Sequence, residues 1–300
     1  MPTIDFIGIG AQKAGTTWLY HRLNELPSFS MLPQKELHYF DRDSKYPSTN
    51  ILQESSLIER KKNDKWFQNS KQHIQNLERA GLIEKANWWR KWFYGNYSDE
   101  WYLSLFEDAK GLKGEITPSY SFLEVEEIKQ MYALAPNAKI IFLIRNTIER
   151  AWSHFCFAFA NEIDYDVMNA PTEDIIKFVG TRGQEMRSNY IQTLQNFQSV
   201  YPKGQILLCF YDAIKEKPKQ LLSQIVSFIG GDISDIDTYC QLDKIHNQSI
   251  KKQIPKEVLE YLQEKYNTQL VYLKNNFGSY ANQWFGQACK AENLNPTIVL

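Results

Sequence analysis

The chain has 300 residues, of which 43% are hydrophobic and 14% aromatic, so it can bury a large core in one domain or two. Its 34 Lys and Arg residues are balanced by 35 Asp and Glu residues, for a net charge of −1. Overall charge therefore gives no support to binding of nucleic acid or of an anionic membrane surface, and any anion must be recognised locally.

Residues 4–26 begin the chain with a predicted strand, a glycine-rich loop and a helix. The apolar run Ile4–Ile9 is typical of a buried strand, and glycines then punctuate the loop up to Gly15. From Thr16 apolar residues recur at helical spacing, at 19, 23 and 26. This order directs backbone N–H groups and a helix N-terminus at one point, which predicts an anion site.

The segment Gly10–Thr17 differs from the nucleotide-binding P-loop, G-x-x-x-x-G-K-[ST], at one position. Thr16 stands where the lysine is expected, and a lysine lies inside the loop at Lys13. In an ATPase that lysine reaches the β- and γ-phosphates, and the hydroxyl after it holds Mg²⁺. Lys13 therefore favours a ligand with a shorter 5′ anionic group and no metal; an ordinary glycine-rich turn is the alternative.

The rest of the chain alternates predicted strands with helices. Strands are expected at 112–116, 139–144 and 205–210, and helices at 124–134, 148–160, 186–200, 218–229 and 255–273; 161–186 is expected to be irregular, and 64–78 to be a solvated helix or a mobile loop. The alternation predicts an α/β, P-loop-like three-layer fold with a central parallel sheet flanked by helices.

Eight aromatic residues lie between Trp88 and Tyr102. They could line a substrate cleft, or they could form the core of a subdomain that covers the sheet, and we favour the core. We expect one domain over residues 1–300, with a variable Trp-rich helical insertion at about 42–110.

The spacing of the cysteines and the length of the apolar runs indicate in which cellular compartment the protein is expected. The four cysteines, at 156, 209, 240 and 289, show no C-x-x-C or other metal-ligand spacing, which favours a reducing compartment and predicts no metal site. The first strand begins by Ile4, which leaves no room for a signal peptide, and no run of 18 apolar residues occurs. The sequence thus predicts no association with a membrane.

Five segments, in order, resemble the sulfotransferases that use 3′-phosphoadenosine 5′-phosphosulfate (PAPS). Lys13–Thr17 resembles their 5′-phosphosulfate loop. The others are similar to the K-E-x-H-F-F-D segment (33–41), the T/S-P-x-Y segment (114–120), the 3′-phosphate segment L-R-N-P-x-x-R-x-x-S (140–153) and a later core strand (201–212), most of all as in the heparan-sulfate-type branch. The resemblance implies a sulfotransferase that converts PAPS to PAP without a metal.

The resemblance also implies a donor site. On the 5′ side it involves Lys13, Ala14, Gly15, Thr16, Thr17 and Trp18. On the 3′ side Arg145 supplies a bidentate fork and Ser153 a hydroxyl, with Arg150 as a competitor. Tyr190 matches a helix position near the ligand, although a core tyrosine is equally consistent. Lys252 aligns with the arginine of a late basic loop, S-K-G-R-x-x-P, whose Lys-Gly pair is missing here.

The acceptor needs a general base. Glu36 occupies the position of the catalytic carboxylate in the heparan-type branch, and His38 points to the same side if the segment is extended. Either residue could take the proton or orient the acceptor. The alternatives are a surface carboxylate paired with Lys35 and a structural histidine.

The identity of the acceptor stays open at this stage. The heparan-type branch suggests a glycan, whereas the divergent segment 42–105 also suits a small secondary metabolite, and we favour a small hydroxylated or amine-bearing molecule. Animal members of the branch carry a Golgi-membrane anchor that this sequence lacks, so we expect a soluble, cytoplasmic, bacterial-type enzyme. A homodimer is compatible with the sequence. The rival interpretations are a P-loop kinase, against which the absent lysine speaks, and a non-catalytic nucleotide- or carbohydrate-binding module.

Overall fold

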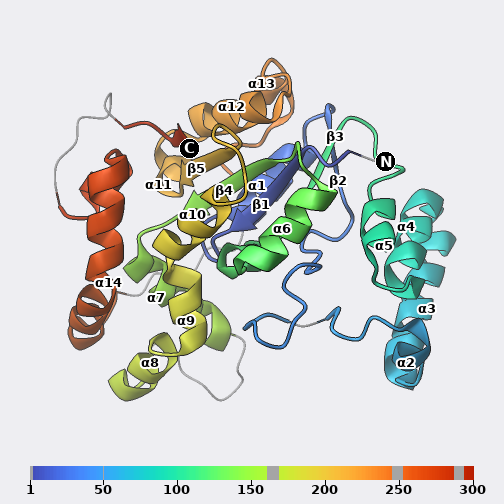
Figure 1. The fold of residues 1–300 in the computed structure, drawn as a ribbon, viewed down its shortest axis with the longest axis horizontal. Coiled ribbons are helices and arrows are strands. Elements are labelled where there is room, and N and C mark those ends of the chain that lie inside the picture. The colour runs from blue at the N-terminus through green and yellow to red at the C-terminus, as the bar shows by residue number, and fades with distance from the viewer. Residues whose placement is uncertain (1–2, 50, 161–168, 245–252, 287–293) are drawn as a thin grey trace.

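The computed structural model describes residues 3–49, 51–160, 169–244, 253–286 and 294–300, in which one sheet is flanked by helices (Figure 1). The strand order is β2-β3-β1-β4-β5-β6; β1 to β5 pair in parallel, and β6 is antiparallel to β5. The strands are β1 (Phe6–Gly10), β2 (Phe29–Met31), β3 (Leu112–Ile116), β4 (Lys139–Ile144), β5 (Ile206–Phe210) and β6 (Thr297–Val299). The predicted fold class is confirmed, with two short edge strands, β2 and β6, that the sequence did not predict.

The centre of the sheet is formed by strands that are apolar along their whole length. β1 and β5 are buried throughout, and β4 is buried from Ile140 to Ile144, as expected for parallel strands covered on both faces. β3 approaches β1 closely at Gly114, where an added Cβ would lie 2.1 Å from the carbonyl oxygen of Phe6. Only glycine therefore fits at this position without moving β1.

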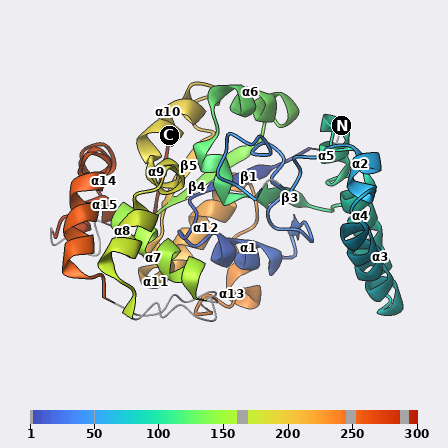
Figure 2. The same cartoon turned by 90° about the horizontal axis from the view of Figure 1, so that it is seen from below.

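The helices form a layer on each side of the sheet, as Figure 2 shows: α6 and α10 lie on one side, and α1 and α12 on the other. The longer helices are α1 (Thr16–Asn24), α6 (Val125–Leu134), α7 (Thr147–Phe159), α10 (Tyr190–Gln198), α12 (Pro218–Ile229) and α14 (Lys256–Phe277). The short ones are η1 (Pro118–Phe122), α11 (Asp212–Glu216), α13 (Ile236–Tyr239) and α15 (Tyr280–Gln283). The apolar stripes of α1, α6, α10 and α12 face the sheet and create the predicted three layers, whereas those of α7 and α14 meet in a second cluster.

The expectation of irregular structure at 161–186 is wrong for its described part. Two helices lie there, α8 (Thr172–Val179) and α9 (Arg182–Ser188). Ile175 and Val179 of α8 are buried in a second apolar cluster with residues of α7 and α14. The helix expected at 186–200 is also divided, because Asn189 leaves helical geometry (φ −83°, ψ 68°) and caps α10 through its side chain.

Four helices occupy the segment between β2 and β3 and stack at one end of the molecule (Figure 1). They are α2 (Leu57–Lys61), α3 (Asp64–Arg79), α4 (Ile83–Tyr94) and α5 (Asp99–Ser104), so 64–78 is helical. Five of the eight clustered aromatic residues are buried here, and the rings of Trp88 and Trp92 stack with centroids 5.7 Å apart. The core role that we favoured is confirmed for those five: Trp88, Trp92, Tyr97, Trp101 and Tyr102.

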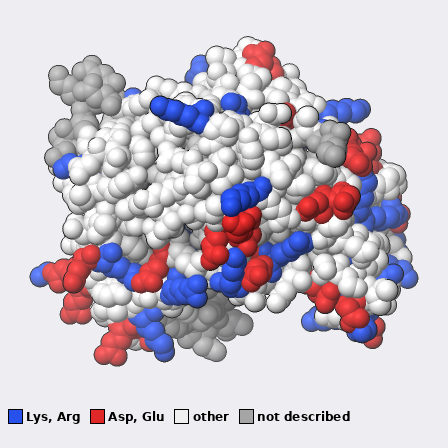
Figure 3. Space-filling view, viewed as in Figure 1, with Lys and Arg blue, Asp and Glu red and all other residues white. Residues whose placement is uncertain are grey.

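Charged side chains of both signs are interspersed on the face shown in Figure 3, mainly along its lower and right-hand parts. This distribution agrees with the near-zero net charge. Among the described helices none is both long and apolar enough to cross a bilayer. The described residues also contain no group of three or more His, Cys, Asp or Glu that could hold a metal ion.

Candidate active site at the carboxyl edge of the sheet

The loop between β1 and α1 has the geometry of an anion site. Gly15 caps α1 with a left-handed backbone (φ 87°), and a Cβ there would lie 2.2 Å from Cδ1 of Ile214. No described backbone carbonyl accepts from the N–H groups of Thr16 and Thr17, and the first turn of α1 holds no acidic residue. The N–H group of Ala14 is used inside the loop, where it donates to the Ala11 carbonyl at 3.1 Å. The helix N-terminus thus presents free donors to an anion.

Lys13 and Arg145 lie side by side although 132 residues separate them in the chain. A guanidinium nitrogen of Arg145 is 3.4 Å from the Lys13 carbonyl oxygen, and the Lys13 ammonium lies 3.8 Å from the ring centre of Phe157. Burial, followed by the charge of Arg145, lowers the pKa of Lys13 to about 8. Arg145 also pairs with Glu149 at 3.1 Å. The two segments predicted to hold the 5′ and 3′ sides of the donor therefore meet in space.

Further positive charge surrounds this edge of the sheet. The pKa of His154 falls to about 3, first because of burial and then because of the charges of Arg150, Arg187 and Lys13. Arg150, the competitor of Arg145, is fully buried and donates to the Ser188 hydroxyl at 2.8 Å and to the Gln184 side-chain oxygen at 2.7 Å. It packs α7 against α9, so Arg145 remains the better candidate for contact with a ligand.

The other residues predicted for the donor site are mostly buried. Ser153 lies in the second turn of α7 and is 3% exposed, and Tyr190 is fully buried with its ring edge-on to Phe142. Trp18 is also buried, and its indole nitrogen lies 3.5 Å from the Leu242 carbonyl. Lys252 lies outside the described residues. The roles of these residues toward a nucleotide stay predictions.

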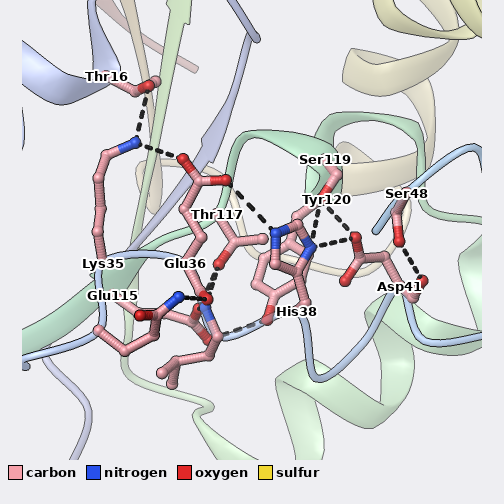
Figure 4. Close-up of polar contacts among 12 residues, drawn as sticks. Thr16, Lys35, Glu36, His38, Asp41, Ser48, Glu115, Thr117, Ser119 and Tyr120 are labelled. Atoms are coloured by element: carbon pink, nitrogen blue, oxygen red, sulfur yellow. Dashed lines mark hydrogen bonds and ion pairs between the residues drawn. The ribbon is translucent and has the colours of Figure 1, made fainter. Parts of the chain in front are cut away.

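Glu36 is tied to the glycine loop through its neighbour Lys35 (Figure 4). The Lys35 ammonium lies 3.2 Å from Oγ1 of Thr16 and 2.8 Å from Oε1 of Glu36. The sequence suggested Lys35 only as a partner that would make Glu36 an ordinary surface residue. In the structure the ammonium instead connects the first turn of α1 to the candidate base.

His38 reaches the other oxygen of the same carboxylate. Its Nε2 is 3.4 Å from Oε2 of Glu36, while Nδ1 lies 2.8 Å from Oδ2 of Asp41 and 3.2 Å from the Ser119 hydroxyl (Figure 4). The extended geometry that was the condition for His38 to share a side with Glu36 is absent at His38, whose φ is 54°. The imidazole meets Glu36 because the chain turns there, not because the two side chains share the face of a strand.

These contacts set opposite protonation states for the two candidate bases. Burial raises the pKa of Glu36, but the hydrogen bond from His38 and the charge of Lys35 outweigh it and bring the pKa to about 2. Burial lowers the pKa of His38, but the hydrogen bonds to Asp41 and Glu36 outweigh it and bring the pKa to about 9. At neutral pH the carboxylate is free of a proton and the imidazolium holds one, so Glu36 is the group able to accept a proton.

A hollow of about 600 Å³ opens beside Glu36. It brings the first helix turn, through Thr17, into the same space as the candidate base. We name it the Glu36 hollow; its lining residues are Thr17, Tyr20, His21, Pro33, Gln34, Lys35, Glu36, His38, Thr49 and Ile51. The space is of the size that small-molecule sites usually have.

A model of the sulfotransferase domain matches residues 3–272. This chain belongs to the sulfotransferase family. A bifunctional heparan sulfate N-deacetylase/N-sulfotransferase 1 of Caenorhabditis elegans is 25% identical over 175 residues, which cover 55% of this chain and 20% of that protein. The chain thus spans only a fifth of the length of that relative. A crystal structure of a sulfotransferase from Alicyclobacillus acidocaldarius superposes with a TM-score of 0.61 at 17% identity, over 95% of this chain and 100% of that one.

The family assignment made from the sequence is therefore confirmed, and the superposition shows the shared fold. Family and fold support transfer of a sulfuryl group, and family membership speaks against the kinase interpretation.

A buried carboxylate anchors the Glu36 segment of this sulfotransferase. Glu115, at the end of β3, accepts from the Leu37 N–H at 3.3 Å and from the Thr117 hydroxyl at 2.6 Å (Figure 4). Its other oxygen accepts from the hydroxyls of Tyr102 at 2.7 Å and Tyr120 at 3.2 Å. Burial raises the pKa of Glu115 to about 7. These donors come from the Glu36 segment, the residue that follows β3, α5 and η1, so Glu115 fixes the base relative to the sheet; sequence reasoning missed it.

Replacement of His38 by asparagine should change how the stability of the sulfotransferase depends on pH. The folded pKa of about 9 exceeds the ordinary 6.5, so the contribution of His38 is complete below pH 6.5 and is lost as pH rises toward 9. The loss amounts to about 3 kcal/mol. Asparagine tolerates a positive φ and does not titrate, so His38→Asn should flatten this part of the profile.

Urea unfolding at pH 6, 7.5 and 9 measures the effect. If the free energy of unfolding fell equally steeply with pH above 6.5 in the natural chain and in His38→Asn, His38 would have no part in the ion pairs described here.

Proposed function

We propose that this sulfotransferase moves a sulfuryl group from PAPS to a hydroxyl, or an amine, of a small acceptor and releases PAP. The observation that carries the proposal is the position of the Lys35 ammonium, 3.2 Å from Thr16 in the donor loop and 2.8 Å from Glu36. A sulfuryl group bound at the loop would face an acceptor placed in the Glu36 hollow, as an in-line displacement requires.

On the donor side, positive charge and N–H groups belong where the leaving 5′-phosphate gains negative charge. Lys13 and the backbone of Gly15–Thr17 supply both. Arg145 and Ser153 are proposed to hold the 3′-phosphate, which distinguishes PAPS from ATP. After burial, the charge of Arg145 lowers the pKa of Lys13, and the charges of Arg150, Arg187 and Lys13 lower the pKa of His154, so positive charge is concentrated at this edge. This concentration supports a strongly anionic ligand there.

On the acceptor side, Glu36 takes the proton. The new bond joins the acceptor oxygen to sulfur, the bond from sulfur to the phosphate oxygen breaks, and the acceptor proton moves to the Glu36 carboxylate. Lys35 and protonated His38 each bind one oxygen of that carboxylate and hold it in place. His38 is therefore proposed as a positioning residue.

Transfer of radiolabelled sulfate from PAPS to a panel of small alcohols, phenols, amines and neutral sugars tests the proposal, beside a parallel assay with ATP and Mg²⁺. Labelled product from PAPS alone is the expected result. Turnover of ATP that depends on Mg²⁺ would instead indicate a kinase, and binding of PAP without transfer to any acceptor would indicate a non-catalytic module.

A further inference from the structure

A second hollow, of about 540 Å³, lies on the helical insertion, next to the Glu36 hollow. Ile51 lines both hollows, so they share a wall. We name the second one the Trp66 hollow; its lining residues are Ile51, Gln53, Glu54, Glu59, Arg60, Asn63 and Trp66. The exposed side chain of Ile51 is thus the boundary that an elongated molecule would cross to occupy both hollows.

Carboxylates and amides dominate the polar lining of the Trp66 hollow. Glu54 and Glu59 are both exposed, and Glu59 pairs with Lys62 on the surface at 2.6 Å. The positive charge of the lining is Arg60, which is only 8% exposed. Its guanidinium nitrogens donate to the carbonyl oxygens of Ser55 at 2.7 Å and Glu54 at 3.0 Å, so they are occupied. The lining therefore presents accessible acceptors and an arginine whose charge is directed into the protein.

Nε of Arg60 makes no hydrogen bond with any described atom, but it is buried and offers no donor to a ligand in the hollow. A ligand hydroxyl can donate to a carboxylate of this lining, whereas a ligand carboxylate can only accept and would be repelled by Glu54 and Glu59. The ring of Trp66 and the exposed side chain of Ile51 add apolar surface, on which the faces of sugar rings pack well.

We propose that the Trp66 hollow is a distal subsite for the neutral, hydroxyl-rich end of an elongated acceptor whose reacting hydroxyl lies at Glu36. The inference rests on the proposed function, and it specifies that the acceptor has a neutral, hydroxyl-rich end. A carboxylate at that end of the acceptor is disfavoured, because it would lie beside Glu54 and Glu59.

Matched acceptors test the subsite. An ω-hydroxyalkyl β-glucoside and the corresponding β-glucuronide differ only in the carboxylate, and 1,4-butanediol is too short to leave the Glu36 hollow. With PAPS as donor, kcat/KM is expected to be about five times higher for the glucoside than for the glucuronide, which corresponds to the usual strength of exposed charge interactions. The double variant Glu54→Gln, Glu59→Gln should remove this difference, and Glu126→Gln, an exposed carboxylate on α6, should not.

Trp66→Ala tests whether the Trp66 hollow contributes to acceptor binding independently of the reaction at Glu36. It should raise KM for the glucoside about fivefold, as expected for loss of an aromatic contact, and leave KM for the diol unchanged. Trp66→Phe keeps a ring on α3 and should restore part of the affinity, which guards against a variant that only misfolds.

The outcomes separate the two proposals. Sulfation that is indifferent to the sugar carboxylate and to Trp66→Ala would overturn the subsite and leave the proposed function intact. Absence of sulfate transfer from PAPS to all three acceptors, together with no binding of PAP in calorimetry, would overturn the proposed function and the subsite with it.

Discussion

Glu36→Gln is expected to lower kcat by about 10²- to 10⁴-fold while the Kd for PAP stays unchanged, because general-base catalysis contributes rate factors of this size. The amide has nearly the shape of the carboxylate, and its oxygen can still accept a hydrogen bond from Lys35 or His38. It cannot take a proton. With a pKa of about 2, Glu36 is ionised throughout the physiological range in the free enzyme.

Single-turnover transfer from PAPS measures the rate, and calorimetry with PAP measures donor binding in the same preparation. Glu126→Gln serves as the matched control, because it removes an exposed carboxylate that pairs with Lys129 at 2.9 Å on a distant helix. A Glu36→Gln enzyme with a near-normal rate would show that the acceptor proton leaves by another route.

The central strands could be predicted from sequence because their pattern is local. The bounds of β3 and β4 agree with the predicted ones, and β5 differs by one residue. β4 and β5 are short apolar runs that are almost entirely buried, whereas β3 contains Lys113 and Glu115 and is bounded by Gly111 and Pro118. β2 and β6 have three residues each, and their strand geometry depends on pairing with β3 and β5. α8 packs against α7 and α14, and its acidic first turn and the i,i+4 spacing of Ile175 and Val179 do favour a helix, which the prediction of irregular structure overlooked.

In the candidate site too, features that carry a local motif could be predicted from sequence, and features that depend on tertiary contacts could not. The glycine loop and Arg145 carry family motifs, so both could be named from sequence, although only the fold shows that Arg145 contacts Lys13. The positive φ of His38, the bridge from Lys35 to Thr16 and the anchoring by Glu115 all depend on tertiary contacts. Glu115 could have been suspected as an acidic residue in an otherwise apolar strand end, because a buried carboxylate needs several donors.

Arg145→Ala is expected to remove the preference for a 3′-phosphate. A hydrogen bond to a charged group contributes about 1.5–3 kcal/mol, so the loss of a bidentate fork should lower the ratio of PAP affinity to adenosine 5′-phosphate affinity by about 100-fold. Because the two nucleotides differ only in the 3′-phosphate, the ratio of their affinities reports only the contacts of that phosphate. Arg145 also contacts the Lys13 carbonyl at 3.4 Å, and a disturbed loop would weaken both nucleotides equally and leave the ratio unchanged.

Calorimetric titration of both nucleotides into the natural chain, Arg145→Ala and Arg145→Lys gives the three ratios. Lysine keeps the charge but loses the planar fork, so an intermediate ratio is expected. Lys129→Ala, which removes a lysine 58% exposed on α6, controls for a general change in positive charge. A preference for PAP that survives Arg145→Ala would place the 3′-phosphate against a cation other than Arg145.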